Sequence, residues 1–137
     1  MSAAAARATI QAYYDAFNAG DLDAMLDTLH VDFAHHVNEG ATRLGKEAFA
    51  DFCRHMSETY REHLTDMVVF ANEDGTRGAA EFVVNGTYLK TDPGLPEARG
   101  QTYVLPAGGF FSLSGGKITR VTTYYNLQDW IRQVSEG

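Results

Sequence analysis

The chain has 137 residues, of which 45% are hydrophobic, 12% aromatic and 21% charged, a composition typical of a globular domain and unlike that of a disordered chain. The formal net charge of -7 argues against a nucleic-acid partner, because binding to a phosphate backbone depends on clustered Lys and Arg side chains. No apolar run approaches the roughly 20 residues that span a bilayer, so we expect no membrane partner.

Residues 1–137 are expected to form a single domain, since this length suits one hydrophobic core and is short for two. The N-terminal residues lack the basic and apolar segments of a secretion signal, which predicts a cytoplasmic protein. Cys53 is the only cysteine, so no disulfide can form within the chain, and no Cys or His spacing resembles a zinc site. We therefore expect no metal and no cofactor, and we expect Cys53 to be a packed thiol.

The first half of the chain predicts helices. Residues 3–18 form an amphipathic helix, because apolar side chains recur at the spacing of one helical face: Ile10, Tyr13, Tyr14 and Phe17. Gly20 ends this helix, and Asp21 can cap a second one whose apolar spacing continues to Leu29. A short β-branched and aromatic run predicts a strand over residues 31–37, and a third amphipathic helix follows over residues 46–60.

The second half predicts a sheet. Strand-like runs cover residues 63–71, 76–89, 101–113 and 117–126, and glycine-containing connections of hairpin length favour antiparallel pairing. The long irregular loop over residues 91–100 is either a pocket rim or a plain connection, and residues 127–134 predict a closing helix. This order predicts an α+β fold in which a curved antiparallel sheet packs against the N-terminal helices and encloses a conical, ligand-binding cavity.

Three segments carry a family resemblance: the run Asn18-Ala19-Gly20-Asp21-Leu22-Asp23, Gly45 at the start of the third helix, and the closing strand with Tyr124-Tyr125-Asn126. Together with the order of elements, they resemble the ketosteroid isomerase-related and SnoaL-like branch of the nuclear transport factor 2-like superfamily, whose fold is cystatin-like. The resemblance covers the whole chain. It implies a cone-shaped sheet, and it implies a homodimer formed through the exposed face of that sheet.

The resemblance also implies positions for catalytic groups. Ketosteroid isomerases remove a proton beside a ketone with a carboxylate and hold the resulting oxyanion with a tyrosine and a protonated aspartate. Alignment on Asn18 to Asp21 without gaps implies the tyrosine at Tyr13 and the base position at Val37, and a count from Pro106 implies the second acid at Gly108. Because valine and glycine cannot ionise, steroid isomerisation by that mechanism is not expected.

Other residues are candidates for proton transfer. Strand alternation with Phe33 and Val37 places His35 inward, where a neutral imidazole could act as a general base or be a hydrogen-bonded core residue. Glu81 lies mid-strand among apolar neighbours, and it is either an acid–base group in the pocket or a solvent-facing or dimer-contact residue. Glu39 is either a solvated turn residue or a group at the cavity mouth.

These considerations predict His35, Tyr13 and Glu81 as the catalytic set. Contacts to a ligand are expected from a larger group of residues: Tyr14, Phe33, Val37, Tyr88, Tyr103, Gly108, Tyr124 and Asn126. For Asn126, capping of the closing helix is an equal alternative.

The leading functional hypothesis is a cofactor-independent isomerase or lyase acting on a small, mainly apolar cyclic or carbonyl compound held in the cone. One alternative is a non-catalytic module that binds a small molecule or another protein. Another is a hydrolase or dehydratase of the same fold, which requires an acid and a base around a water, offered here by Glu81 with His35.

Overall fold

The computed structural model describes residues 2–37 and 40–136, so Glu39 lies outside the described residues. The elements follow in the order α1 (Ala3–Ala19), α2 (Leu22–Leu26), β1 (Leu29–Val37), β2 (Arg43–Leu44), α3 (Lys46–Thr59), β3 (Tyr60–Ala71), β4 (Arg77–Tyr88), β5 (Thr102–Ser114), β6 (Lys117–Tyr125) and α4 (Leu127–Glu136). The predicted α+β class with N-terminal helices and a curved sheet is confirmed.

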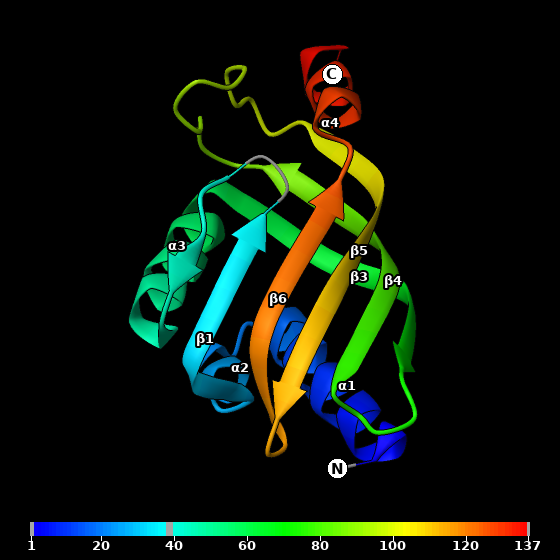
Figure 1. Cartoon of the computed structure of the whole chain (residues 1–137). Coiled ribbons are helices and arrows are strands. Elements are labelled where there is room, and N and C mark those ends of the chain that lie inside the picture. Colours follow the sequence, from blue (N-terminus) through cyan, green and yellow to red (C-terminus); the bar gives the residue numbers. More distant parts are fainter. Residues whose placement is uncertain (1, 38–39, 137) are drawn as a thin grey trace.

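The sheet has six strands in the order β2-β1-β6-β5-β4-β3. Strands β1 and β6 pair in parallel, with His35 opposite Val121, and the other neighbours pair antiparallel. The sheet curls strongly, so that α1 and α2 lie behind it, α3 flanks β1, and α4 stands at one end beside the 91–100 loop (Figure 1). This arrangement makes the concave face of the sheet the wall of a cone.

Local signals in the sequence account for most of the element boundaries. Ser2 caps α1 by accepting a hydrogen bond from the Ala5 N–H, and Gly20 ends that helix in a left-handed conformation with φ of 68°. The structure differs from the predictions in several places: α2 ends at Leu26, β1 begins at Leu29, β3 already begins at Tyr60, and the two-residue strand β2 was not predicted. A strand that short has no periodicity to detect, and the early start of β3 follows directly on α3 without a turn signal.

The free edge of β3 is held by the end of α1. The Asn18 side-chain amide donates to the Leu64 carbonyl (3.0 Å) and its Oδ1 accepts from the Leu64 N–H (2.9 Å). A bulge follows between Thr65 and Val68, where Asp66 has a φ of 55° and bends the strand. In the part of the chain that the structure describes, no helix is long and apolar enough to cross a bilayer.

Candidate functional site

A cavity of about 1160 Å³ lies between the concave face of the sheet and the helices. Pockets for small molecules commonly have volumes of about 300–1,000 Å³, so this cavity can hold a compound of several rings. Aromatic side chains from six elements line it: Tyr13, Tyr14, Phe17, Phe49, Phe52, Tyr60, Phe82, Tyr125 and Trp130. Such a wall favours a flat, mainly apolar guest.

His35 lies in the most buried part of this wall. Its imidazole is 3% exposed and sits 4.8 Å from the ring of Phe49 and 4.9 Å from that of Phe52. Its Nδ1 has no hydrogen-bond partner among the described residues. Burial lowers the pKa of His35 to about 4, and the positive charge of Arg43 and the neighbouring His36 add to this effect. The imidazole is therefore neutral at neutral pH.

Two tyrosines of α1 continue the wall beyond Phe49. The ring of Tyr13 stacks on Phe49 with centroids 6.3 Å apart, and burial raises its pKa well above the usual range, so its hydroxyl remains a hydrogen-bond donor. The Tyr14 hydroxyl is buried against Gly109, where an added Cβ would lie only 2.4 Å from it, and it has no partner among the described residues. Both tyrosines line the cavity.

A buried carboxylate forms a second polar region. Glu62 of β3 lines the cavity, and its Oε2 accepts a hydrogen bond from the Tyr103 hydroxyl at 2.5 Å. Burial raises the pKa of Glu62, and the hydrogen bond from Tyr103 partly opposes that rise. Glu62 and Tyr103 also border a shallower groove of about 500 Å³. The carboxylate thus stands between the cavity and this groove.

The cavity rim near the 91–100 loop is also polar. Asp92 accepts hydrogen bonds from the Tyr60 hydroxyl (2.6 Å) and pairs with His55 Nε2 (3.1 Å). Elsewhere on the wall, the Arg43 guanidinium lies 4.1 Å above the ring of Phe52.

Burial raises the pKa of the Cys53 thiol to about 11, so it is protonated and unsuited to nucleophilic attack. Within residues 2–37 and 40–136, no three His, Cys, Asp or Glu side chains are grouped to hold a metal ion.

The SnoaL-like domain matches residues 10–121, most of the chain. The protein belongs to the SnoaL-like family. This confirms the relationship predicted from the Asn18 to Asp23 run and the order of elements. None of the curated proteins matches the chain.

Solved structures place this SnoaL-like protein among close relatives. A candidate polyketide cyclase from Silicibacter is 65% identical with a TM-score of 0.94, and the alignment covers 98% of each chain. A second candidate polyketide cyclase, from Xanthomonas campestris, is 58% identical with a TM-score of 0.92 over 95% of this chain and 96% of that one. An epoxide hydrolase of Mycobacterium tuberculosis, 16% identical with a TM-score of 0.73 over 98% of this chain and 92% of the other, shares the fold alone.

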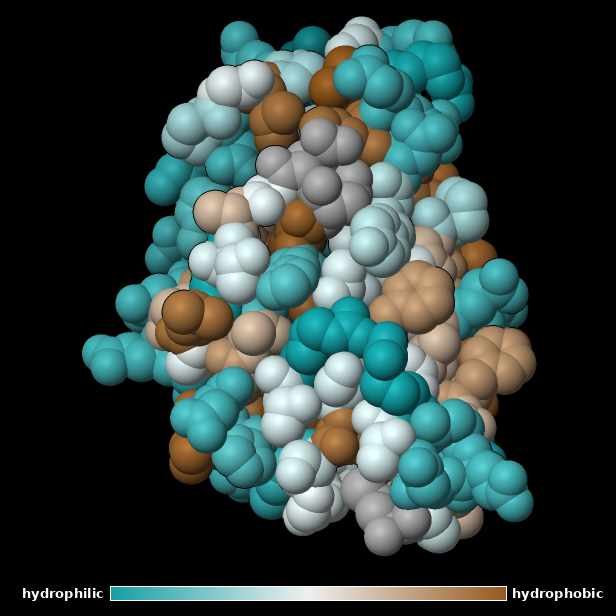
Figure 2. Space-filling view, in the orientation of Figure 1, coloured by the Kyte–Doolittle hydropathy of each residue, from teal (hydrophilic) through white to brown (hydrophobic). Residues whose placement is uncertain are grey.

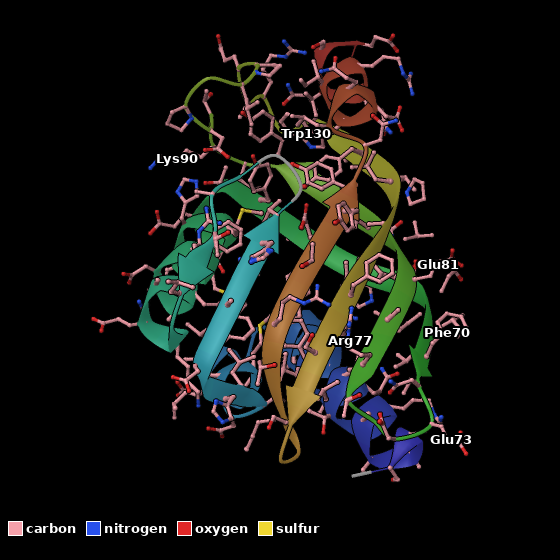
Figure 3. The ribbon with its side chains drawn as sticks, in the orientation of Figure 1. Phe70, Glu73, Arg77, Glu81, Lys90 and Trp130 are labelled. Atoms are coloured by element: carbon pink, nitrogen blue, oxygen red, sulfur yellow. The ribbon has the colours of Figure 1, made fainter. Side chains whose placement is uncertain are left out.

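Three predicted site residues lie on the convex side of the sheet. Glu81 is exposed between the buried Ala80 and Phe82, and Figure 3 shows it beside Phe70, directed away from the sheet. Gly108 and Tyr124 pair with each other on that same outer face, and Tyr124 is 52% exposed. Their assignment to the cavity was wrong, because strand alternation turns the neighbouring positions inward. The proposed pairing of Glu81 with His35 around a water is likewise excluded.

The remaining predicted residues divide between wall, core and cap. His35, Tyr13, Tyr14 and Val37 line the cavity. Phe33 and Tyr88 are fully covered core residues, and the Tyr88 hydroxyl donates to the Pro96 carbonyl. Asn126 is exposed and caps α4 by accepting from the Asp129 N–H at 3.0 Å. Phe33 and Tyr88 do not line the cavity, so the expectation that they contact a ligand there was wrong, whereas for Asn126 the alternative of capping α4 is confirmed.

The sequence-based predictions missed Glu62. The predicted helix ended at residue 60 and the predicted strand began at residue 63, so Glu62 fell outside both elements. The sequence nevertheless held a signal for Glu62. Tyr60, Glu62 and Leu64 stand at every second position, so in a strand they share one face, which is the inner face of β3. Tyr103 was predicted as a direct ligand contact, whereas the structure shows it reaching the cavity through Glu62.

Proposed function

We propose that this SnoaL-like protein is a cofactor-free enzyme that moves a proton on a small, mainly apolar cyclic or carbonyl compound, as an isomerase, lyase or cyclase. The observation that carries the proposal is the meeting of polar groups on one aromatic cavity. The Tyr13 hydroxyl, the neutral His35 imidazole and the Glu62 carboxylate all face it. Each can take part in proton transfer or oxyanion binding without a cofactor.

The chemistry follows from where these groups stand. A ring system stacks among the aromatic side chains, which excludes water and strengthens each hydrogen bond inside. The carbonyl oxygen accepts from Tyr13, and removal of a neighbouring proton gives an enolate whose charge that hydroxyl stabilises. Ring closure and isomerisation both begin with this step, in keeping with the relatives named as candidate polyketide cyclases.

The first test uses β-tetralone, a two-ring ketone with acidic hydrogens beside its carbonyl. Binding is followed by the fluorescence of Trp130, the single tryptophan of the chain, and proton removal by proton NMR of exchange in heavy water. We expect saturable exchange above the buffer rate, and a loss of about 100-fold in Tyr13→Phe with binding retained. Binding without exchange would support a non-catalytic binding module, and absence of both would refute the pocket itself as a site for carbonyl compounds.

We also infer that the convex face joins two copies of the chain. Apolar side chains there expose between 47% and 57% of their surface: Val68, Phe70, Val104, Phe110 and Tyr124. Figure 2 shows this face, with tan and brown side chains between hydrophilic ones on the side of β4 and β5. An exposed apolar face of this kind suits a two-fold interface, in which the same patch of each copy meets its counterpart.

Light scattering at micromolar concentration should give twice the 15.1 kDa mass of the chain. Phe110→Glu, in the middle of the face, should give the monomer mass. Leu44→Glu on β2 is the matched control, because Leu44 is also exposed (74%) but lies at the opposite edge of the sheet, and it should leave the dimer intact. A monomeric wild-type protein would refute the interface.

A further inference from the structure

A row of three residues across the sheet builds the Glu62 site. Glu62 of β3 lies opposite Gly86 of β4, and Gly86 lies opposite Tyr103 of β5. A Cβ at position 86 would be 2.2 Å from Tyr103 Cζ, so the tyrosine ring occupies the space that a side chain there would fill. The absence of a side chain at Gly86 therefore lets the Tyr103 hydroxyl reach Glu62 across a whole strand.

Trp130 of α4 backs the tyrosine of this hydrogen bond. Its ring packs against the ring of Tyr103 with centroids 5.9 Å apart. Figure 3 shows Trp130 beneath α4, directed towards the sheet. Because an ionised carboxylate can only accept, the Tyr103 hydroxyl donates its proton to Glu62. The hydrogen bond uses Oε2 of Glu62, which leaves Oε1 available to a guest.

Other carboxylates on the cavity wall are occupied or exposed. The described wall contains Asp21, Glu58, Glu62 and Asp92. Asp21 caps α2, Asp92 is bound by Tyr60 and His55, and Glu58 is exposed to solvent. Glu62 differs in having a pKa raised by burial and in being held by the Tyr103 hydroxyl inside the sheet. His35 is a weaker base, because its pKa is lowered to about 4.

We propose that Glu62 is the catalytic residue that takes the proton from the substrate and returns it, with Tyr103 and Trp130 as its positioning residues. This inference rests on the proposed function and names the group that performs it. The C–H bond beside the carbonyl breaks, its proton passes to Glu62 Oε1, and its electron pair forms the enolate. Delivery of a solvent deuteron from the carboxyl to the same carbon gives exchange, and delivery of the proton to another carbon gives isomerisation. The outer groove that Glu62 borders lets the carboxyl exchange its proton with solvent while a guest fills the cavity.

The decisive variant is Glu62→Gln, assayed by exchange of β-tetralone in heavy water. The exchange rate should fall by about 100-fold or more, since the amide cannot take the proton, while the dissociation constant from Trp130 fluorescence should stay nearly unchanged. Glu73→Gln, which removes an exposed carboxylate in the turn between β3 and β4 and away from the cavity, is the control and should keep the wild-type rate. Exchange that survives in Glu62→Gln and disappears in His35→Phe would overturn the assignment while leaving the proposed function in place.

Tyr103→Phe tests the positioning role separately. Removing a hydrogen bond that favours the carboxylate should raise the pKa of Glu62 further, so the rising limb of the rate–pH profile should move to higher pH. NMR of wild-type protein labelled at the glutamate carboxyl carbon measures the same pKa without any substrate. A Glu62 resonance that titrates at the usual value of about 4.3, unaffected by Tyr103→Phe, would refute the inference even if Glu62→Gln failed to fold.

Discussion

Lowering the pH from 6.5 towards 4 should destabilise the wild-type fold more than a His35→Phe variant. The folded state lowers the pKa of His35, so the unfolded chain binds a proton at a higher pH than the folded one does. Stability from the neutral, buried imidazole is fully present above pH 6.5 and is lost as the pH falls towards the folded value of about 4. At about 1.4 kcal/mol per pKa unit, the loss reaches up to about 3 kcal/mol.

Urea unfolding at several pH values between 7 and 4 measures this difference, with the variant compared to wild type at each pH so that the titration of carboxylates cancels. His63→Gln, which removes an exposed imidazole of β3, is the matched control. A wild-type stability that falls in parallel with that of His35→Phe over this range would show that the imidazole at position 35 is not held in its neutral form.

Gly86→Ala should be among the most damaging single-methyl additions in the sheet. The new Cβ would lie 2.2 Å from Tyr103 Cζ and 2.3 Å from Cε2, and the tyrosine ring is backed by Trp130 and cannot move aside freely. Overpacking of this kind costs about 1–3 kcal/mol of unfolding free energy. Displacement of the ring also breaks the hydrogen bond to Glu62, so exchange activity should fall together with stability.

A double-mutant cycle identifies the cause of that damage. Tyr103→Leu removes the clashing ring, so Gly86→Ala should cost much less in that background than in wild type. Gly108→Ala is the control, because its Cβ would meet only the Ala80 carbonyl oxygen at 3.3 Å on the outer face of the neighbouring strand. Equal costs for Gly86→Ala in both backgrounds would show that the ring of Tyr103 does not occupy the space over Gly86.

The sequence predicted the architecture because its signals were local. Apolar spacing defined α1 and α3, capping side chains and glycines marked their ends, and the alternation of β1 placed His35 on the inner face, where the structure has it. Predictions that depended on counting along the chain without such a pattern failed. Gly108 was placed by an ungapped count from Pro106. Leu105 and Gly109 lie on the inner face of β5, so strand alternation puts Gly108 on the outer face.

The Glu62 site could not be derived in the same way, because it depends on the pairing of three strands. Nothing near Glu62 in the sequence indicates that Gly86 and Tyr103 lie beside it, 24 and 41 residues further along. Glu81 attracted attention because its sequence neighbours are apolar, yet those neighbours face the opposite side of the strand. Burial of a carboxylate is therefore set by register and curvature, which only the folded sheet defines.

The contact of Asn18 with Leu64 has a consequence for solubility. An edge strand offers unpaired N–H and C=O groups on which a strand of another molecule can assemble. Asn18 occupies both groups that Leu64 presents at the edge, and the bulge at Asp66 twists the following residues out of line. The curved sheet is thereby protected from pairing with a strand of another molecule along its β3 edge.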